Sequence, residues 1–516
     1  MKVVMMMTSP KLLAALLTGF SLAVVTFVSL GAIRGAPPIQ AAPARPSPPG
    51  AVRLATQTAL SQPFLVRDIH PGPENADPAE LTSVGSRLFF VADDGSHGEE
   101  LWVSRGSFFN TTLVKDIYPG SGGDANVSQL IALSDTLFFR ADDGSHGTEL
   151  WKSDGTATGT VMVKDIRPGY NSSYPLQMAV WQEQLYFSAN DGSHGYELWR
   201  SDGTSTGTVM VKDAADGVYS NSPNWLTAVN DRLYFRGSDR NFDTELWQSD
   251  GTATGTVRLK DINPGPTSSN PAYLAGVGDL LYFQADDGSH GKELWRSDGT
   301  PTGTVIIKDI YPGSDGANPI HLTGLNSHCF FQADDGSHGK ELWSSDGTPA
   351  GTLMVKDINP TGIQDSEPFQ LTVLSETLFF VAADGWSGAD VHGGELWRSD
   401  GTATDTMMIT DINASPSVYP YGLSALNGAL YFQANDGRHG YEPWLSDGTP
   451  TGSGTLMISD IYSGSTGSSP RDFTAVGPAI FFHADDGSHG RELWVMGSAP
   501  VVISPTYLPL ILRHEP

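Results

Sequence analysis

The loop sequence Asp-Asp-Gly-Ser-His-Gly recurs along the chain and repeatedly brings carboxylates close to an imidazole. Adjacent carboxylates and loop carbonyls are oxygen ligands of the kind calcium prefers, and the candidates are Asp286, Asp287, Asp334 and Asp335. The spaced Asp-x-Asp-x-Asp-Gly pattern of established calcium loops is missing. The alternative is that these aspartates accept hydrogen bonds from amides of their own loops. The sequence thus requires no cofactor, and calcium is the candidate ion.

The histidines of these loops do not form a shared metal site. Each belongs to a different copy of the repeat, and no second histidine or cysteine accompanies it locally, whereas zinc needs ligands about 2 Å from one ion. We therefore expect each histidine to stabilise its own turn. The eight histidines are His97, His146, His194, His290, His338, His392, His439 and His489.

A Glu-Leu-Trp triplet follows most of these loops and offers a carboxylate for general acid catalysis beside an aromatic ring that could stack on a sugar. The Glu and the Trp recur in all nine copies, for example as Glu149 and Trp151. A single active site usually breaks the symmetry of a repeat. We therefore assign these residues to the core and turns of the shared scaffold.

Two copies break the symmetry of this loop and are the better candidates for a ligand site. The seventh copy carries an insertion with Trp386 and Asp390 before His392, and the fourth replaces the loop with Arg240, Asn241 and Phe242. An exposed aromatic side chain could serve as a platform for a sugar or a peptide. Ordinary loop drift is the alternative explanation for both changes.

The elements that hold these loops repeat with a period of 47 to 54 residues, as the nine recurring tryptophans from Trp102 to Trp494 show. One clean copy, 274–310, contains four short apolar runs, which we call strands a to d, separated by Gly- and Asp-rich turns. Such a period is typical of propeller blades. We predict an all-β fold, a β-propeller of nine four-stranded blades.

The order of the strands predicts how the ring closes. A d strand at 64–69 comes first in the chain, and an a–b–c triplet ending near Trp494 comes last. The first strand can therefore complete the last blade and hide both sheet edges. Nine blades exceed the usual four to eight, so an open or split ring is the alternative.

Two further features fit radial packing. Strand b lacks alternation, as in Leu281-Tyr282-Phe283, so both of its faces should be buried. The single cysteine, Cys329, occupies a position that other copies fill with leucine or isoleucine, so it should be a small buried hydrophobic residue. In usual propeller geometry the b–c and d–a loops share one face, which these aspartates would make acidic.

The segment Glu149-Leu150-Trp151-Lys152-Ser153-Asp154-Gly155-Thr156, repeated with little change in most copies, resembles the ELWxxDGT repeat family of exported bacterial proteins. The match covers about 64–497. The first copy departs from the signature at 104–108, and Pro443 replaces leucine in the eighth. The resemblance implies a secreted or surface repeat protein and brings no catalytic residues to this chain.

The terminal segments and the net charge indicate where the protein is located and which partners it could bind. We expect a signal peptide or uncleaved signal anchor at 1–42, a Pro/Ala-rich linker at 43–63, the propeller at 64–497 and an apolar tail at 498–516. The formal charge of −28 opposes nucleic-acid binding. We expect an extracytoplasmic monomer that is secreted or held at the cell surface, contacting a membrane only through the N-terminal segment if it is uncleaved.

Taken together, the sequence predicts a binding or adhesion module that presents an acidic loop face to a cation, a glycan or a surface protein. No nucleophile–base pair, cofactor loop or metal quartet occurs in the sequence, so we expect a protein that is not an enzyme. A glycan-processing hydrolase or lyase is the first alternative, because propellers can place paired carboxylates at the axial mouth. A structural surface-layer component is the second.

Overall fold

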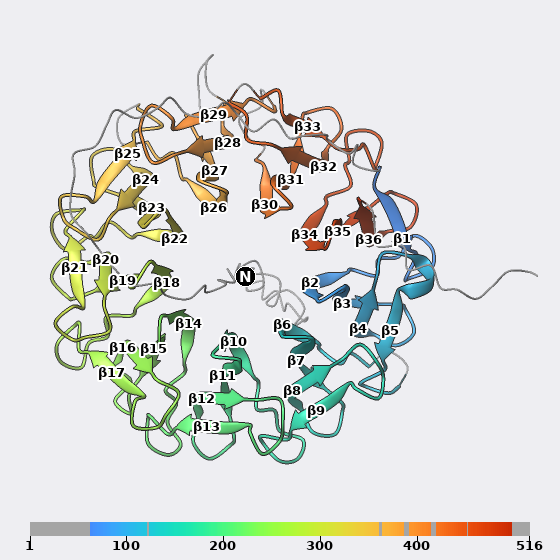
Figure 1. Ribbon diagram of the computed structural model, residues 1–516, viewed down its shortest axis with the longest axis horizontal. Coiled ribbons are helices and arrows are strands. Elements are labelled where there is room, and N and C mark those ends of the chain that lie inside the picture. The colour runs from blue at the N-terminus through green and yellow to red at the C-terminus, as the bar shows by residue number, and fades with distance from the viewer. Residues whose placement is uncertain are drawn as a thin grey trace, which may run out of the picture. The chain divides into compact units, whose positions relative to one another are not determined.

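The computed structural model describes residues 62–120, 123–360, 364–385, 392–413, 419–450 and 452–497. These residues form nine four-stranded antiparallel sheets arranged as the blades of a β-propeller (Figure 1). The prediction of a nine-bladed, all-β propeller is confirmed. The predicted signal segment and C-terminal tail lie outside the described residues, as does the predicted linker except for Gln62 and Pro63.

Each blade contributes one a strand to the inner circle of the ring (Figure 1). Blades are numbered 1 to 9 along the chain. The a strands are β2 (Ala79–Val84), β6 (Ser128–Leu133), β10 (Leu176–Trp181), β14 (Asn224–Val229), β18 (Ala272–Val277), β22 (Ile320–Leu325), β26 (Phe369–Leu374), β30 (Tyr421–Leu426) and β34 (Arg471–Val476).

The b and c strands form the middle of each blade. The b strands are β3 (Arg87–Asp93), β7 (Thr136–Asp142), β11 (Gln184–Asn190), β15 (Arg232–Ser238), β19 (Leu280–Asp286), β23 (His328–Asp334), β27 (Thr377–Ala383), β31 (Ala429–Asn435) and β35 (Ala479–Asp485). The c strands are β4 (Glu99–Ser104), β8 (Thr148–Ser153), β12 (Tyr196–Ser201), β16 (Thr244–Ser249), β20 (Lys292–Ser297), β24 (Lys340–Ser345), β28 (Gly394–Ser399), β32 (Tyr441–Ser446) and β36 (Arg491–Met496).

The d strands lie at the outer edge. They are β5 (Thr112–Lys115), β9 (Val161–Lys164), β13 (Val209–Lys212), β17 (Val257–Lys260), β21 (Val305–Lys308), β25 (Leu353–Lys356), β29 (Met407–Thr410), β33 (Thr455–Met457) and, for blade 9, β1 (Phe64–Arg67). In the described part of the chain the one helix is a 3-10 turn, Phe108–Asn110. No helix there is long and apolar enough to cross a bilayer.

The first strand closes the ring, as predicted. β1 pairs with β36 in antiparallel register, with Leu65 opposite Trp494. The buried Glu492 carboxylate then accepts hydrogen bonds from the amides of Ile69 (3.0 Å) and His70 (3.1 Å), which lie just beyond β1. The open or split arrangement is therefore excluded. With β1, blade 9 has four strands like every other blade.

The hydrophobic core lies between blades. Nine apolar clusters each draw on two neighbouring blades, and one of them joins Phe90 and Trp102 of blade 1 to Phe481 of blade 9. The b strands are buried on both faces, and Cys329 is fully buried among them. Near the axis space is tight, since a Cβ on Gly276 would lie 3.0 Å from a Val229 methyl group. Small residues on strand a therefore meet a packing demand.

Candidate functional site

The b–c loops and the d–a loops meet on one face of the ring, as the sequence predicted. In blade 1 the amide of Ala125, from the d–a loop, donates to the carbonyl of Glu99, at the end of the b–c loop. The Glu100 carboxylate, next along β4, accepts the amides of Ile117 (3.0 Å) and Tyr118 (3.1 Å) from the same d–a loop. A buried glutamate thus fastens the two loops together.

These buried glutamates have strongly shifted pKa values. Burial raises the pKa of Glu100, Glu149 and Glu293 to about 7, although amide hydrogen bonds oppose the shift. Burial raises the pKa of Glu492 to about 8. Each is fully buried and accepts hydrogen bonds from its own d–a loop, so its position is set by the scaffold.

The carboxylates of the loop aspartates accept hydrogen bonds from groups within their own turns. Asp286 Oδ1 accepts the Gly288 amide (2.8 Å), and Asp287 accepts the amides of Ser289 and His290 and the His290 ring Nδ1 (2.8 Å). Asp334 and Asp335 repeat this pattern in blade 6. The calcium assignment to these four residues stays a prediction, but their hydrogen bonds match those of turn caps.

In each Asp–His pair, the hydrogen bond between the two side chains shifts both of their pKa values. Burial acts to raise the pKa of Asp143, but hydrogen bonds from the His146 ring and from loop amides outweigh it and hold that pKa below its usual value. The hydrogen bond to Asp143 raises the pKa of His146 in turn. The same opposite shifts occur in the Asp287–His290 pair of blade 5.

A hollow of about 530 Å³ lies between blades 1 and 2, with Asp116 and Trp151 among the residues that line it. Trp151 is only 5% exposed and its indole Nε1 has no hydrogen-bond partner, while the buried Asp116 Oδ1 also has none. The remaining lining residues are Lys115, Ile117, Tyr118, Pro119, Asp143, Gly144 and Ser145. Two lining residues therefore each hold a buried polar atom without a partner, a donor on Trp151 and an acceptor on Asp116.

Lys115 limits which part of the Trp151 side chain a ligand could contact. Its ammonium lies 5.4 Å from the centroid of the Trp151 ring and donates to the Thr160 carbonyl (3.0 Å). The lysine thus covers the ring, and the indole is left to act through its N–H edge. The same unpartnered Trp and Asp atoms recur at other junctions, such as Trp343 with Asp309. This recurrence supplies matched comparisons within one chain.

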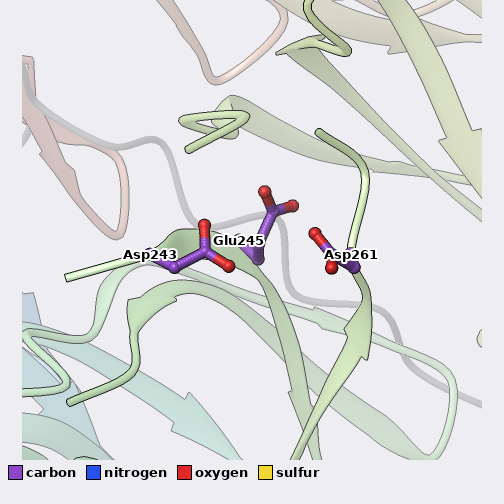
Figure 2. A group of neighbouring side chains, drawn as sticks. All are labelled: Asp243, Glu245 and Asp261. Atoms are coloured by element: carbon purple, nitrogen blue, oxygen red, sulfur yellow. The ribbon is translucent and has the colours of Figure 1, made fainter. Parts of the chain in front are cut away.

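Blade 4 holds a second polar cluster, in which Asp243, Glu245 and Asp261 offer ligand atoms within 4.8 Å of one another. Figure 2 shows the three carboxylates around a common space. Arg258 reaches the cluster, with Nη1 2.6 Å from Asp243 Oδ2 and Nη2 3.8 Å from Asp261 Oδ2. Burial raises the pKa of both Asp243 and Glu245.

The structure describes four of the six predicted ligand-binding residues. Trp386 and Asp390 lie outside the described residues, while His392 is held by Asp384, with 2.7 Å between Nδ1 and Oδ2. In the fourth copy Arg240 Nη1 lies 3.8 Å from Asp216 Oδ2, and the Asn241 amide donates a hydrogen bond to Asp239 Oδ1. Phe242 is 69% exposed and packs edge-on against Tyr219. Their role in binding stays a prediction.

Sequence reasoning missed both the junction hollow and the cluster in blade 4. The hollow depends on how residues 115–119 pack against residues 143–145 of the next blade, which no motif records. The cluster could have been found, because Asp243 stands where the other eight copies carry glycine before the Glu-Leu-Trp triplet. Arg258 likewise replaces an apolar residue of strand d, such as Ile306.

Comparison with known proteins gives a fold and no family. No family model matches the chain, and no curated protein matches it, so membership of the ELWxxDGT repeat family stays a prediction. Among solved structures it resembles oligopeptidase B from Leishmania major, with 11% identity and a TM-score of 0.39, over 69% of this chain and 53% of that one.

Two other matches are of the same kind. A puromycin-hydrolysing peptidase from Mycobacterium tuberculosis matches at 11% identity and a TM-score of 0.36, over 73% of this chain and 61% of that one. The propeller domain of the trilobed protease from Pyrococcus furiosus matches at 10% identity and a TM-score of 0.35, over 75% of this chain and 98% of that one. The chain spans between about half and three fifths of the length of the two whole peptidases. At these identities the likeness extends to the propeller fold alone.

The prediction of an adhesion module is corrected by these findings. The matched structures are peptidases and a protease propeller domain, and none of those named here is an adhesion protein. The expectation of a protein that is not an enzyme conflicts with the same matches, although the propeller is only part of those enzymes. The physical reason for the error is that a binding role was inferred from the repeated aspartates, whereas Asp286 and Asp287 accept hydrogen bonds from amides of their own loops.

Proposed function

We propose that the propeller recognises a soluble peptide in the hollow between blades 1 and 2. The observation that carries the proposal is that two residues lining the hollow each hold a buried polar atom without a partner, the Trp151 Nε1–H donor and the Asp116 Oδ1 acceptor. Every peptide unit other than proline offers one acceptor and one donor, which complements this pair. The hollow of about 530 Å³ has the size of a small-ligand site.

The packing around Trp151 favours a peptide over a sugar. A sugar stacks on an exposed aromatic face, but Trp151 is 5% exposed and its ring lies under the Lys115 ammonium. The carboxylates of Asp116 and Asp143, which line the hollow, also favour a ligand that donates hydrogen bonds or carries positive charge. A peptide with a lysine or arginine side chain meets both demands.

The test is a binding screen with the full chain. A positional-scanning peptide library and a neutral glycan panel would be titrated by fluorescence anisotropy, followed by calorimetry on the best peptide. Trp151→Phe keeps a ring but removes the N–H, so we expect affinity to fall about tenfold, equivalent to about 1.4 kcal/mol for one buried hydrogen bond. Trp343→Phe is the matched control, because it changes the same repeat position at another junction.

The outcomes separate the alternatives. Retained binding in Trp343→Phe with loss in Trp151→Phe supports the proposal, and Asp116→Asn should weaken binding while Asp309→Asn does not. Equal losses in both tryptophan variants would place the effect in general destabilisation and overturn it. Glycan binding without peptide binding would also overturn it.

A further inference from the structure

We propose that blade 4 binds a divalent cation of the calcium class between Asp243, Glu245 and Asp261. The site is separate from the peptide hollow and from the loop aspartates considered above. All three residues supply carboxylate oxygens, and oxygen-only ligand sets select hard cations such as Ca²⁺ over zinc or copper.

The local backbone of blade 4 makes room for the third carboxylate. In other blades the position of Asp243 is glycine, and a Cβ there would collide with the next d–a loop; at Gly291 it would lie 2.6 Å from the Ser314 carbonyl oxygen. In blade 4 the loop closes instead through Asp239, whose amide donates to the Asp243 carbonyl (3.0 Å). Asp243 is thereby held 3% exposed beside Glu245, the glutamate of this blade that recurs in all nine copies.

Two oxygen atoms of the cluster lack a partner. Asp243 Oδ1 and Asp261 Oδ1 are buried and accept no hydrogen bond, and the three carboxylates surround one space (Figure 2). The Glu245 oxygens already accept from the Ile262 amide (3.0 Å) and the Ser269 amide (2.9 Å), which fixes that carboxylate in place. Buried acceptors without a donor are costly, so a ligand supplied from solvent is favoured.

The net charge of the cluster also favours a bound cation. Arg258 contributes one positive charge to three carboxylates, through a 2.6 Å contact to Asp243 and a 3.8 Å contact to Asp261. Two negative charges remain uncompensated in a largely buried cluster, and one divalent cation would balance them. A proton is the competitor, because burial raises the pKa of Asp243 and of Glu245.

The experiment measures ion binding by the full chain at pH 7.5, where protons compete less for the carboxylates than at acidic pH. Calcium would be titrated into chelator-treated protein by calorimetry, and melting temperatures would be compared in calcium and in chelator. We expect saturable binding and a rise of several degrees with calcium. Asp243→Gly, which restores the residue of the other copies, and Asp243→Asn should both lose the binding and the shift.

A matched control separates this site from the loop aspartates. Asp335→Asn in blade 6 should keep the calcium-dependent shift even if its baseline melting temperature falls. Circular dichroism would establish that each variant is folded. Coincident wild-type curves in calcium and chelator would overturn the proposal, as would a shift that survives in both Asp243 variants.

Discussion

At the scale of single residues, the same side chain serves different purposes in this protein. Asp286 caps a loop amide, Asp116 keeps a buried oxygen without a partner, and Asp243 faces two other carboxylates. The amino-acid composition does not distinguish these three aspartates. Their roles differ because the surrounding backbone either supplies amide donors or does not, and that supply is a property of the folded loops.

The shifted pKa values predict that the propeller loses stability as pH rises from 5 to 8. Burial raises the pKa of Glu149 from 4.5 to about 7, so its contribution is complete below the unfolded value and is lost as pH rises through the folded one. The raised pKa of His146 acts in the same direction. Scanning calorimetry at pH 5, 6, 7 and 8 should give falling melting temperatures.

A Glu149→Gln variant tests the cause. Glutamine does not titrate, so the slope of melting temperature against pH should become shallower. The variant should also be less stable by about 1–3 kcal/mol at pH 5, because one acceptor facing the amides of Ile166 and Ser173 becomes a donor. A slope identical to wild type, or a melting temperature that rises from pH 5 to 8, would contradict this explanation.

Residue-level features were partly predictable. The repeated Asp and His were expected to serve their own turns, and hydrogen bonds such as Asp287–His290 agree. The pairing of Asp243 with Arg258 was not foreseen, although both depart from the repeat at once. Strand c and strand d bring them together across one blade, and a scan of a single loop does not reveal such a contact.

At the scale of elements, the repeat specifies more than strand positions. Lysines at the ends of d strands reach across to the next blade: Lys308 lies 5.7 Å from the centroid of the Trp343 ring and donates to the Thr352 carbonyl (2.9 Å). Lys115 and Lys356 make the same pair of contacts at other junctions. Thr410 replaces this lysine between blades 7 and 8.

We predict that Lys308→Met lowers the free energy of unfolding by about 1–2 kcal/mol, since it removes one cation–π contact and one charged hydrogen bond. Denaturant unfolding measures the change. Lys292→Met, at an exposed lysine in β20, is the control and should stay within about 0.5 kcal/mol of wild type. Equal effects of the two substitutions would show that the junction contact contributes nothing.

The strands themselves followed from the sequence, because apolar runs and Gly-rich turns recur every 48 residues or so. The start of each inner strand did not. There the pairing shifts register, as between Ala79 and Thr82, and the second residue has a positive φ, 55° at Glu80 and 59° at Trp225. Its identity varies among blades, so no residue signature marks the bulge.

At the scale of the whole molecule, blade number and closure were predictable because both follow from counting strands. The function was not, because nine-fold repetition describes the scaffold, and the repeated aspartates on which the adhesion role was based, such as Asp286, cap their own turns. The features on which the proposed ligand sites rest are local: a hollow between two blades and one carboxylate cluster in blade 4. The hollow depends on how loops of two successive blades pack together, and the cluster on residues at β16 and just after β17 of one blade.

The central claim is that the first strand, β1, seals a ring of nine blades by pairing with β36. Hydrogen exchange followed by mass spectrometry tests it directly, because amides in a paired strand are protected and those of a free segment exchange at once. We expect peptides covering Phe64–Arg67 to be protected to the same degree as those covering the d strand Val305–Lys308. Rapid exchange across Phe64–Arg67, with the other d strands protected, would contradict the closed ring.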